Sequence, residues 1–333
     1  MSALRVGLMG TAHVHAEQYA VLLARAHNVT WLGASEPDPA CHLPGTRMFS
    51  SHEALLAEQP DAVVIASETA SHLDLVRLAA QAGAHILCEK PIEVSLERAQ
   101  ALRIVCEASG VSFMTAFPMR FDPHLLDLRS RLQRGEVGEI LALNGVNHSE
   151  NPARHRAWFA SLALAGGGAT MDHSVHLTDL YRWLTGREIT RISAEVTTAP
   201  GSEVDTASLI GLDLGDGIFA AIDASWSRPA QYPRWGHLRL EVIGTYGTLD
   251  LDPMAQTVTV YSRHDRPTRW ENWGPNSESH MLEAFLASVR AGTPPPVSWL
   301  DGYRALQVAL AAVTSSATGQ CVTFTSAVLK KEG

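Results

Sequence analysis

The sequence predicts an α/β Rossmann-type doubly wound parallel sheet plus a C-terminal α+β domain with a large, mostly antiparallel sheet. Three observations support this fold class. The chain has 333 residues, which is too long for one simple core. Residues 1–118 alternate short apolar runs with helical stretches, as repeated βα units do. Beyond residue 138 strand-like runs follow one another directly, so we expect a second domain over residues 119–333.

In the first domain, serines mark the expected starts of three of the four predicted helices. Ser50 with Glu53, and Ser71 with Asp74, have the spacing of N-terminal capping pairs. A third helix is expected to start at Ser95 and to end near Gly110. The predicted strands are 4–9, 29–35, 62–66, 84–88 and 111–116, and the predicted helices are 14–26, 50–58, 71–83 and 95–110.

The second domain begins with a helix and continues with strands. Asp122-Pro123 is typical of an N-cap and first helical turn, which predicts a helix through Arg134. Gly215-Asp216-Gly217 suits a hairpin turn. A broad one-layer sheet needs cover on its second face, so we expect a homodimer or homotetramer formed through it. The predicted strands are 140–147, 189–198, 206–214, 218–226, 237–243, 248–251 and 257–261, and the predicted late helices are 279–291 and 300–318.

Composition narrows the classes of function. Hydrophobic residues make up 46% and charged residues 18%, which excludes long disorder. The net charge of −9 disfavours nucleic acid and anionic membranes as partners. No secretory pattern precedes the first strand, and no apolar run reaches the ~18 residues of a membrane helix. Four cysteines without a C-x-x-C pair suggest reduced thiols, so we expect a soluble cytoplasmic protein.

The first strand-to-helix turn predicts a dinucleotide site. It occupies the place where such folds have G-x-G-x-x-G, which lets the backbone approach a pyrophosphate at a helix N-terminus. Gly10 keeps the first glycine, while Ala12 and His15 replace the second and third. We expect Gly10, Thr11, Ala12 and His13 to contact the cofactor.

Residues at the ends of two further strands are also predicted to contact the dinucleotide. Glu36 ends the second strand, where a carboxylate accepts hydrogen bonds from ribose hydroxyls and repels a 2′-phosphate, so NAD is favoured over NADP. The alternative is a surface glutamate in a loop. Ser67, Thr69 and His72 follow the third strand and are expected to line the cofactor, although His72 could simply pack.

Lys90 is the first candidate for catalysis. It lies in Glu89-Lys90-Pro91, directly after the apolar run 84–88. Ligands of open α/β sheets collect at the carboxyl ends of strands, and the proline stops further strand pairing. We expect Glu89 and Lys90 to contact the cofactor as well. The alternative is a lysine that is merely ion-paired to Glu89.

A glycine-rich turn, 166–168, leads into a helix that carries further candidates. On that helix Asp172, His176 and Asp179 share one face, and His173 lies on the adjacent apolar stripe. A carboxylate one turn from an imidazole can fix its tautomer and raise its basicity, as a general base requires. A simply solvated polar face is the alternative reading.

Histidines and arginines suggest two weaker ideas. A metal site would draw on His13, His15, Asp172, His173 and His176, but no H-x-x-x-H or H-E-x-x-H pattern with a third ligand is present, so we expect no metal. Positive charge and an aromatic ring gather near the domain junction, where they could attract an acidic sugar, or could form an ordinary basic loop. These residues are Arg120, Arg154, His155, Arg156 and Trp158.

These segments together resemble the Gfo/Idh/MocA family of NAD(P)-dependent oxidoreductases, which includes inositol and glucose–fructose enzymes. The resemblance runs through nearly the whole chain, and its most specific motifs are Glu89-Lys90-Pro91 and the glycine turn 166–168 followed by Asp172-x-x-x-His176. It is supported by Arg120-Phe121-Asp122-Pro123 and by the run 244–249. The turn after the first strand, and Glu68 where a proline is common, depart from the family pattern.

The resemblance implies that Lys90, Asp172 and His176 meet around the nicotinamide ring between the domains. It implies oxidation of a secondary alcohol of a sugar, sugar acid or cyclic polyol, in which His176, oriented by Asp172, takes the hydroxyl proton and Lys90 stabilises the alkoxide. We expect substrate contacts at Arg120, Arg156, Trp158 and His173. An NAD-using glycoside hydrolase and a non-catalytic NAD- or sugar-sensing regulator are the alternatives.

Overall fold

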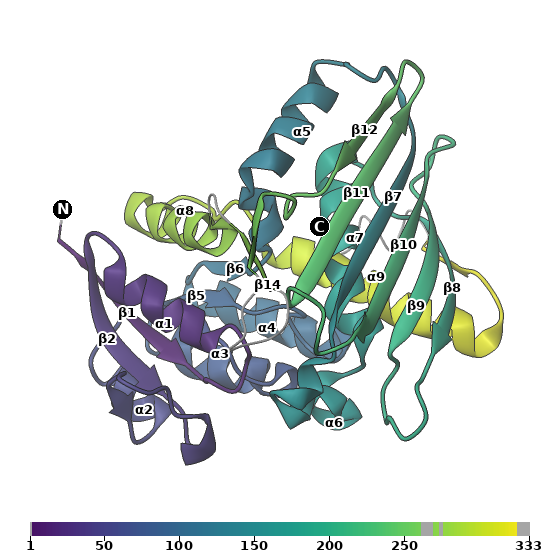
Figure 1. The fold of residues 1–333 in the computed structure, drawn as a ribbon. Helices are drawn as coiled ribbons and strands as arrows, with labels where there is room; N and C mark the ends of the chain where they lie inside the picture. Colours follow the sequence, from purple (N-terminus) through teal and green to yellow (C-terminus); the bar gives the residue numbers. More distant parts are fainter. Residues whose placement is uncertain (1, 261–268, 273–275, 325–333) are drawn as a thin grey trace. The chain divides into compact units, whose positions relative to one another are not determined.

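The computed structural model describes residues 2–260, 269–272 and 276–324, which form two compact units (Figure 1). Both units are discontinuous in sequence. Unit 1 combines Met1–Phe117 with Ala153–Gly166 and Ser279–Tyr303. Unit 2 combines Pro118–Pro152, Gly167–Glu278 and Arg304–Gly333. Two segments from the second half of the chain therefore pack with the N-terminal unit.

Unit 1 is built on a six-stranded sheet in the order β3-β2-β1-β4-β5-β6, with every neighbouring pair parallel. This confirms the predicted doubly wound parallel sheet. The edge strand β3 was not predicted, because two residues are too short to show a periodicity. The strands are β1 (Leu4–Met9), β2 (Val29–Ser35), β3 (Met48–Phe49), β4 (Ala62–Ile65), β5 (His85–Cys88) and β6 (Phe113–Thr115).

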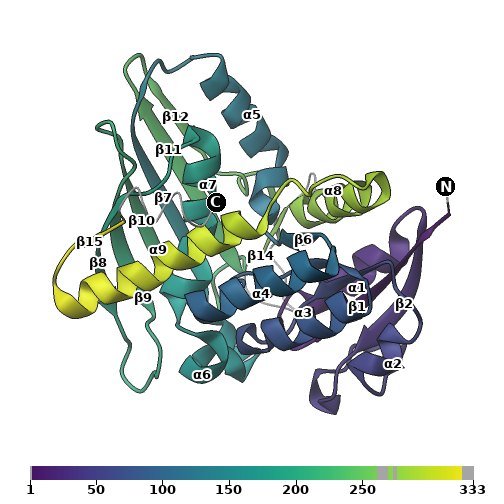
Figure 2. The same cartoon turned by 180° about the vertical axis from the view of Figure 1, so that it is seen from behind.

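Helices cover both faces of this sheet. Figure 1 views unit 1 from the side of α1, and Figure 2 views it from the side of α3 and α4. Successive helices α2, α3 and α4 contact one another. The helices that contribute to unit 1 are α1 (Ala16–Arg25), α2 (His52–Leu56), α3 (His72–Gln81), α4 (Leu96–Ser109), α6 (Leu162–Ala165), α8 (Ser277–Ala291) and the start of α9 (Trp299–Thr318).

Two of the three helix starts predicted at serines in unit 1 were wrong in detail. Helix α2 begins at His52, so Ser51 rather than Ser50 has the extended backbone of an N-cap, and its hydroxyl accepts the Ala54 N–H at 3.2 Å. The helix start predicted at Ser95 is confirmed, and the Ser95 hydroxyl caps α4 by accepting the Arg98 N–H at 3.3 Å.

The other wrong cap lies at the start of α3. Ser71 is already helical there, because the 3₁₀ turn Thr69–Ser71 runs straight into α3, and its side chain makes no capping bond. The carboxylate of Glu93 does this instead, accepting the Leu73 N–H at 2.9 Å.

Unit 2 contains a seven-stranded sheet in the order β12-β11-β7-β10-β9-β8-β15. Only β7 and β10 are parallel among its neighbouring pairs, which confirms the mostly antiparallel prediction. The predicted strand 257–261 lies instead in a separate two-stranded ribbon, and its residue 261 is outside the described residues. The strands are β7 (Ile140–Glu150), β8 (Arg191–Thr197), β9 (Ala207–Asp213), β10 (Phe219–Arg228), β11 (Gly236–Gly244), β12 (Thr248–Leu251), β13 (Thr257–Val260), β14 (Arg269–Asn272) and β15 (Val322–Thr323).

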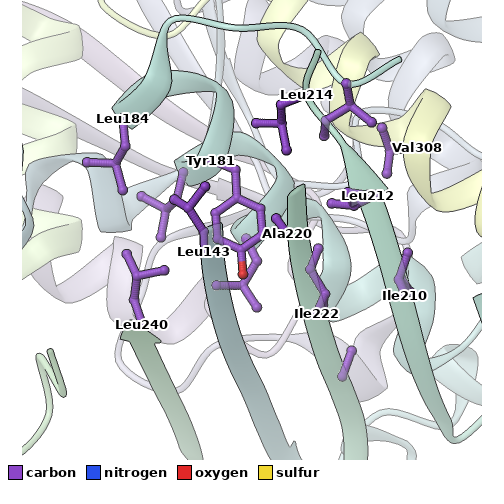
Figure 3. Packing of buried hydrophobic residues seen from close by; sticks show 14 of the residues in the cluster. Leu143, Tyr181, Leu184, Ile210, Leu212, Leu214, Ala220, Ile222, Leu240 and Val308 are labelled. Carbon is purple, nitrogen blue, oxygen red and sulfur yellow. The ribbon is translucent and has the colours of Figure 1, made fainter. Parts of the chain in front are cut away.

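The core of unit 2 lies between one face of this sheet and its helices, α5 (Pro123–Gln133), α7 (Ala169–Thr185) and the later part of α9 (Figure 3). Tyr181 of α7 is fully buried, and its hydroxyl donates to the carbonyl of Ala221 at 2.7 Å. Gly145 of β7 makes room for this ring, since a Cβ there would lie 2.4 Å from the Tyr181 oxygen. The predicted cap of α5 is confirmed, with Asp122 accepting the His124 N–H at 2.9 Å.

Two findings concern membrane-spanning helices and the state of the cysteines. No helix in the part that the structure describes is long and apolar enough to cross a membrane. All four cysteines are free, and Cys88 and Cys106 are buried. Burial raises the pKa of the Cys106 thiol to about 12, so this thiol stays protonated and unreactive near neutral pH.

Candidate functional site

The turn after β1 has the backbone of a dinucleotide-binding turn. Gly10 has φ +76°, and a Cβ there would lie 2.6 Å from the Ser67 side chain at the end of β4. Only glycine fits this position. The backbone N–H of His13 donates to the Ala66 carbonyl at 3.0 Å, which ties the turn to β4. β1 and β4 are neighbours at the point where the strand order reverses, where such sheets bind their ligands.

Glu36 lies beside this turn at the end of β2. Its two carboxylate oxygens accept the backbone N–H groups of Thr11 at 2.9 Å and Asp38 at 3.0 Å. The Thr11 hydroxyl donates to the Cys41 carbonyl at 2.6 Å. A carboxylate held at the carboxyl end of β2 fits the ribose-binding position of an NAD site.

A second acid stands close to Glu36. Burial, followed by the negative charges of Glu36 and Asp38, raises the pKa of the Glu68 carboxyl, against the opposing effect of a backbone hydrogen bond. Three carboxylates therefore gather at this edge, and together they disfavour an additional phosphate. This observation agrees with the preference for NAD over NADP.

The other predicted residues of the β4 end are enclosed. The Ser67 hydroxyl donates to the Glu68 carbonyl at 3.1 Å, and Thr69 is 1% exposed. His72 is buried, with Nδ1 3.2 Å from the Ile92 carbonyl, so it ties α3 to the loop after β5. Burial is the main reason that the pKa of His72 lies below its ordinary value. The burial of His72 and its contact with Ile92 agree with the alternative given above, in which this side chain simply packs.

Glu89 and Lys90 follow β5 and are both buried. The Glu89 carboxylate accepts the Tyr19 hydroxyl at 2.8 Å and the Lys90 backbone N–H at 3.1 Å, and lies 2.9 Å from Nδ1 of His15. Burial alone would raise the pKa of Glu89, but the positive charges of His13, His15 and Lys90 hold it well below its usual range. Glu89 is therefore an anion at every physiological pH.

The segment Ala153–Gly166 belongs to unit 1 and packs on the turn after β1. The Trp158 indole N–H donates to the Ala12 carbonyl at 2.9 Å, and its ring stacks on Phe159 with centroids 3.9 Å apart. His13 packs against both rings. Arg156 is half-buried and is close enough to influence the Cys41 thiol, whose pKa is nevertheless raised, mainly by burial. Phe159 was missed, because no sequence spacing links it to residue 13.

In unit 2 the end of the glycine turn, at Gly168, is anchored by a residue that sequence reasoning also missed. The Asp205 carboxylate accepts the N–H groups of Gly168 at 2.9 Å and Thr170 at 2.7 Å, and so caps α7 from outside the helix. A Cβ on Gly168 would lie 1.8 Å from the Asp205 carbonyl oxygen. The contacts with Asp205 therefore fix the residue at which helix α7 starts.

Asp172 and His176 are the half-buried polar residues on the first turns of α7, whereas His173 between them is buried. The Asp172 carboxylate accepts the Trp226 indole N–H at 3.0 Å and lies 3.2 Å from Nε2 of His173. His173 also bonds the Asn147 carbonyl through Nδ1 at 2.9 Å. These contacts hold Asp172 and His173 in fixed orientations on the sheet of unit 2.

Arg120 and Asp179 form a buried ion pair within unit 2. The guanidinium Nε donates to Asp179 at 2.7 Å, and a second guanidinium nitrogen bonds the other carboxylate oxygen. Their side chains are 8% and 1% exposed. Asp179 was expected to share a face with Asp172 and His176, and the structure shows it pairing with Arg120 beneath the surface.

Comparison with known proteins points to one family. An oxidoreductase family with an NAD-binding Rossmann fold matches residues 4–117, and the GFO/IDH/MocA C-terminal domain matches residues 125–250. A scyllo-inositol 2-dehydrogenase (NAD⁺) of Bacillus subtilis is 31% identical over 84% of this chain and 82% of its own length. A myo-inositol dehydrogenase of Streptomyces leeuwenhoekii is 30% identical, over 80% and 81%.

Solved structures share the fold. GenD2 from gentamicin A biosynthesis, solved in complex with NAD, has a TM-score of 0.88 and 23% identity over 98% of this chain and 97% of its own. A putative myo-inositol dehydrogenase from Sinorhizobium meliloti 1021 has a TM-score of 0.81 and 24% identity, over 97% and 100%. At these identities the likeness shows a common architecture.

Proposed function

We propose that this chain, which belongs to the Gfo/Idh/MocA family of oxidoreductases, oxidises a secondary alcohol of a sugar, sugar acid or cyclic polyol with NAD. Membership of this family implies an NAD(P)-dependent dehydrogenase activity on CH–OH groups. The observation that supports NAD is the Glu36 carboxylate held beside the glycine turn. The inositol dehydrogenases among the relatives make cyclic polyols the first substrates to test.

The catalytic roles are assigned to Lys90, Asp172 and His176. Bound NAD supplies the hydride acceptor. His176 takes the hydroxyl proton as general base, and the ammonium of Lys90 donates a hydrogen bond to the same oxygen as it becomes an alkoxide. Asp172, which is held by Trp226 and His173, orients His176 in this proposal. Arg120, Arg156, Trp158 and His173 stay predicted substrate contacts.

The test of this assignment is Lys90→Met. Methionine keeps the length of the buried side chain but loses the charge, so we expect kcat to fall by about 10²–10³-fold, as it does when one oxyanion donor is removed. NAD affinity, measured by quenching of tryptophan fluorescence, should change little. Arg77→Met removes one exposed positive charge and serves as the matched control. Unchanged turnover on every alcohol that the wild type oxidises would rule out the role of Lys90.

A double variant tests whether Lys90 and His176 act in one reaction. Groups that handle the same oxygen and proton are strongly non-additive, so Lys90→Met with His176→Ala should cost little more than the worse single change. Additive losses in kcat/KM would mean separate roles.

The alternative of a glycoside hydrolase has its own test. Tightly held NAD that turns over without net NADH release would favour that alternative over the dehydrogenase.

Assembly through the sheet of unit 2 is part of the proposal. The sheet face turned away from the core includes exposed apolar residues, with Leu209 and Phe219 both 62% exposed. Cross-strand pairing places Leu209 in one row with Glu195, Asp223, Val146 and Arg239. We expect a homodimer or homotetramer by light scattering, and a monomer for Leu209→Asp/Phe219→Asp. Ile104→Asp, on α4 of unit 1 and 60% exposed, is the control. A monomeric wild type would contradict this assembly.

A cytoplasmic location also belongs to the proposal. The chain's four free cysteines, two of them buried, suit a reducing compartment. Expression of a tagged chain followed by fractionation tests it, and recovery in a secreted fraction would contradict it.

A further inference from the structure

Three side chains that can ligate a metal converge in unit 1. His13 and His15 come from the turn after β1, and Glu89 follows β5, 74 residues beyond His15. One ring nitrogen of each histidine and one Glu89 oxygen all lie within 4.8 Å of one another. The Glu89 oxygen is 2.9 Å from Nδ1 of His15 and 3.9 Å from Nδ1 of His13.

These separations suit one small cation. Zinc binds nitrogen and carboxylate oxygen at about 2.0–2.2 Å in tetrahedral sites, so neighbouring ligand atoms lie about 3.3 Å apart. The two distances to the Glu89 oxygen lie on either side of that value. Only small movements of the His13 and His15 rings are needed to equalise them. The 3.3 Å bond from the His15 N–H to Nδ1 of His13 is long and is the contact that a metal would replace.

The surroundings of these three side chains suit a metal ligand set. The side chains of His13 and Glu89 are each 2% exposed, and Trp158 and Phe159 pack against the His13 ring. The Glu89 carboxylate is oriented by the Tyr19 hydroxyl and by the Lys90 backbone N–H. Donors of this kind behind a ligand fix its orientation and raise metal affinity.

We propose that His13, His15 and Glu89 bind one divalent transition-metal ion of the zinc class. Two imidazoles and one carboxylate suit zinc, cobalt and nickel, whereas calcium and magnesium prefer oxygen ligands. Three protein ligands leave the fourth position for water or another small ligand. The ion joins the turn after β1 to the end of β5, next to Lys90, and braces a turn that has lost two of its three glycines. This site does not depend on the proposed dehydrogenase reaction.

The test is metal binding by the full chain after treatment with a chelator. Cobalt(II) is titrated and followed by its visible absorption, and zinc is titrated by calorimetry with metal content measured by mass spectrometry. We expect one ion per chain, bound at micromolar concentration, with the strong visible bands of four- or five-coordinate cobalt. Absence of a saturable site below about 100 μM in the wild type would overturn the proposal.

Variants separate this site from adventitious binding. His15→Ala changes a partly exposed side chain, so it should leave the fold intact by circular dichroism while weakening binding at least tenfold. Glu89→Gln should act in the same direction, and Tyr19→Phe should weaken binding less. His27→Ala, at an exposed histidine, is the control and should bind like the wild type. Equal affinity in His15→Ala, Glu89→Gln and the wild type would mean that the ion binds elsewhere, which also overturns the proposal.

Discussion

At the scale of single residues, the Glu36 carboxylate has two roles: it holds the turn after β1, and it favours NAD over NADP. It binds the backbone of the turn after β1 through Thr11, and its charge stands with those of Asp38 and Glu68 at the same edge. The charge repels a 2′-phosphate, while the oxygens accept hydrogen bonds from hydroxyls. The two effects act in the same direction, so Glu36 is the residue on which preference for NAD depends most directly.

Glu36→Gln should therefore shift cofactor preference toward NADP. We expect the ratio of NADP to NAD affinities to rise by at least about tenfold, since like charges placed together cost several kcal/mol. The ratio is the right measure, because a weaker hold on the backbone N–H groups of Thr11 and Asp38 affects the binding of both cofactors alike. Glu107→Gln, at an exposed glutamate of α4, is the control. An unchanged ratio in fluorescence titrations would contradict the role of Glu36.

His72 gives a prediction about stability and pH. Burial lowers its pKa in the folded chain, against an ordinary value of 6.5. As the pH falls below 6.5, the unfolded chain takes up a proton that folded His72 refuses, so the free energy of unfolding falls. The slope from this one residue reaches at most about 1.4 kcal/mol per pH unit.

The matched variant is His72→Asn, which keeps a donor near Nδ1 but does not titrate. Urea unfolding between pH 7.5 and 5.5 should show a shallower loss of stability in the variant than in the wild type. Other histidines with lowered pKa values, among them His52 and His85, titrate in both proteins. Their contributions to the free energy of unfolding therefore cancel in the comparison. Parallel curves for the two proteins would show that His72 does not contribute.

At the scale of elements, helix α7 is held at two points by side chains from elsewhere in unit 2. Asp205 caps its N-terminus, and Arg120 of the 3₁₀ turn Pro118–Phe121 pairs with Asp179 further along. Asp172 and His176 lie between these two anchors. The position of the proposed general base therefore depends on contacts that are distant in sequence.

Arg120→Met tests which of two roles Arg120 has. Removal of one member of a buried ion pair costs about 3–5 kcal/mol, because the other charge stays buried without this partner. We expect a loss of that size in urea unfolding, and partial recovery in Arg120→Met/Asp179→Leu, where no charge remains. If Arg120 mainly binds substrate, KM rises in the single variant while the unfolding midpoint stays the same.

The elements show what could be predicted from the sequence and what could not. The strands of unit 1 other than β3, and the Gly10 turn, follow from local patterns, and so do the strand ends that carry Glu36 and Lys90. The capping roles of Glu93 and Asp205 were not predicted, because each carboxylate reaches a helix end far away in the sequence. The cap at Ser50 was wrong by one residue, since two adjacent serines offer the same chemistry and the helix start decides between them.

At the scale of the whole molecule, unit 1 is completed by parts of the second half of the chain. The Trp299 indole N–H donates to the Ala99 carbonyl of α4 at 2.8 Å, and Trp158 donates to Ala12. Both tryptophans are 8% exposed. Gly302 packs so closely that a Cβ would lie 2.5 Å from side-chain atoms of Ile92 and Thr115. The Rossmann sheet therefore lacks much of its cover if the chain is cut after residue 118.

A fragment of residues 1–118 should then fail to fold cooperatively. Loss of one buried tryptophan costs about 3–5 kcal/mol, and the fragment loses two, whereas a whole domain is stable by only about 5–15 kcal/mol. We expect no sharp thermal transition by circular dichroism and no NAD binding, with the full chain as the positive control. Trp299→Ala in the full chain should lower the free energy of unfolding by about 3–5 kcal/mol. A fragment that melts cooperatively and binds NAD would show that the parallel sheet is self-sufficient, and that the later segments add stability without being needed for the fold.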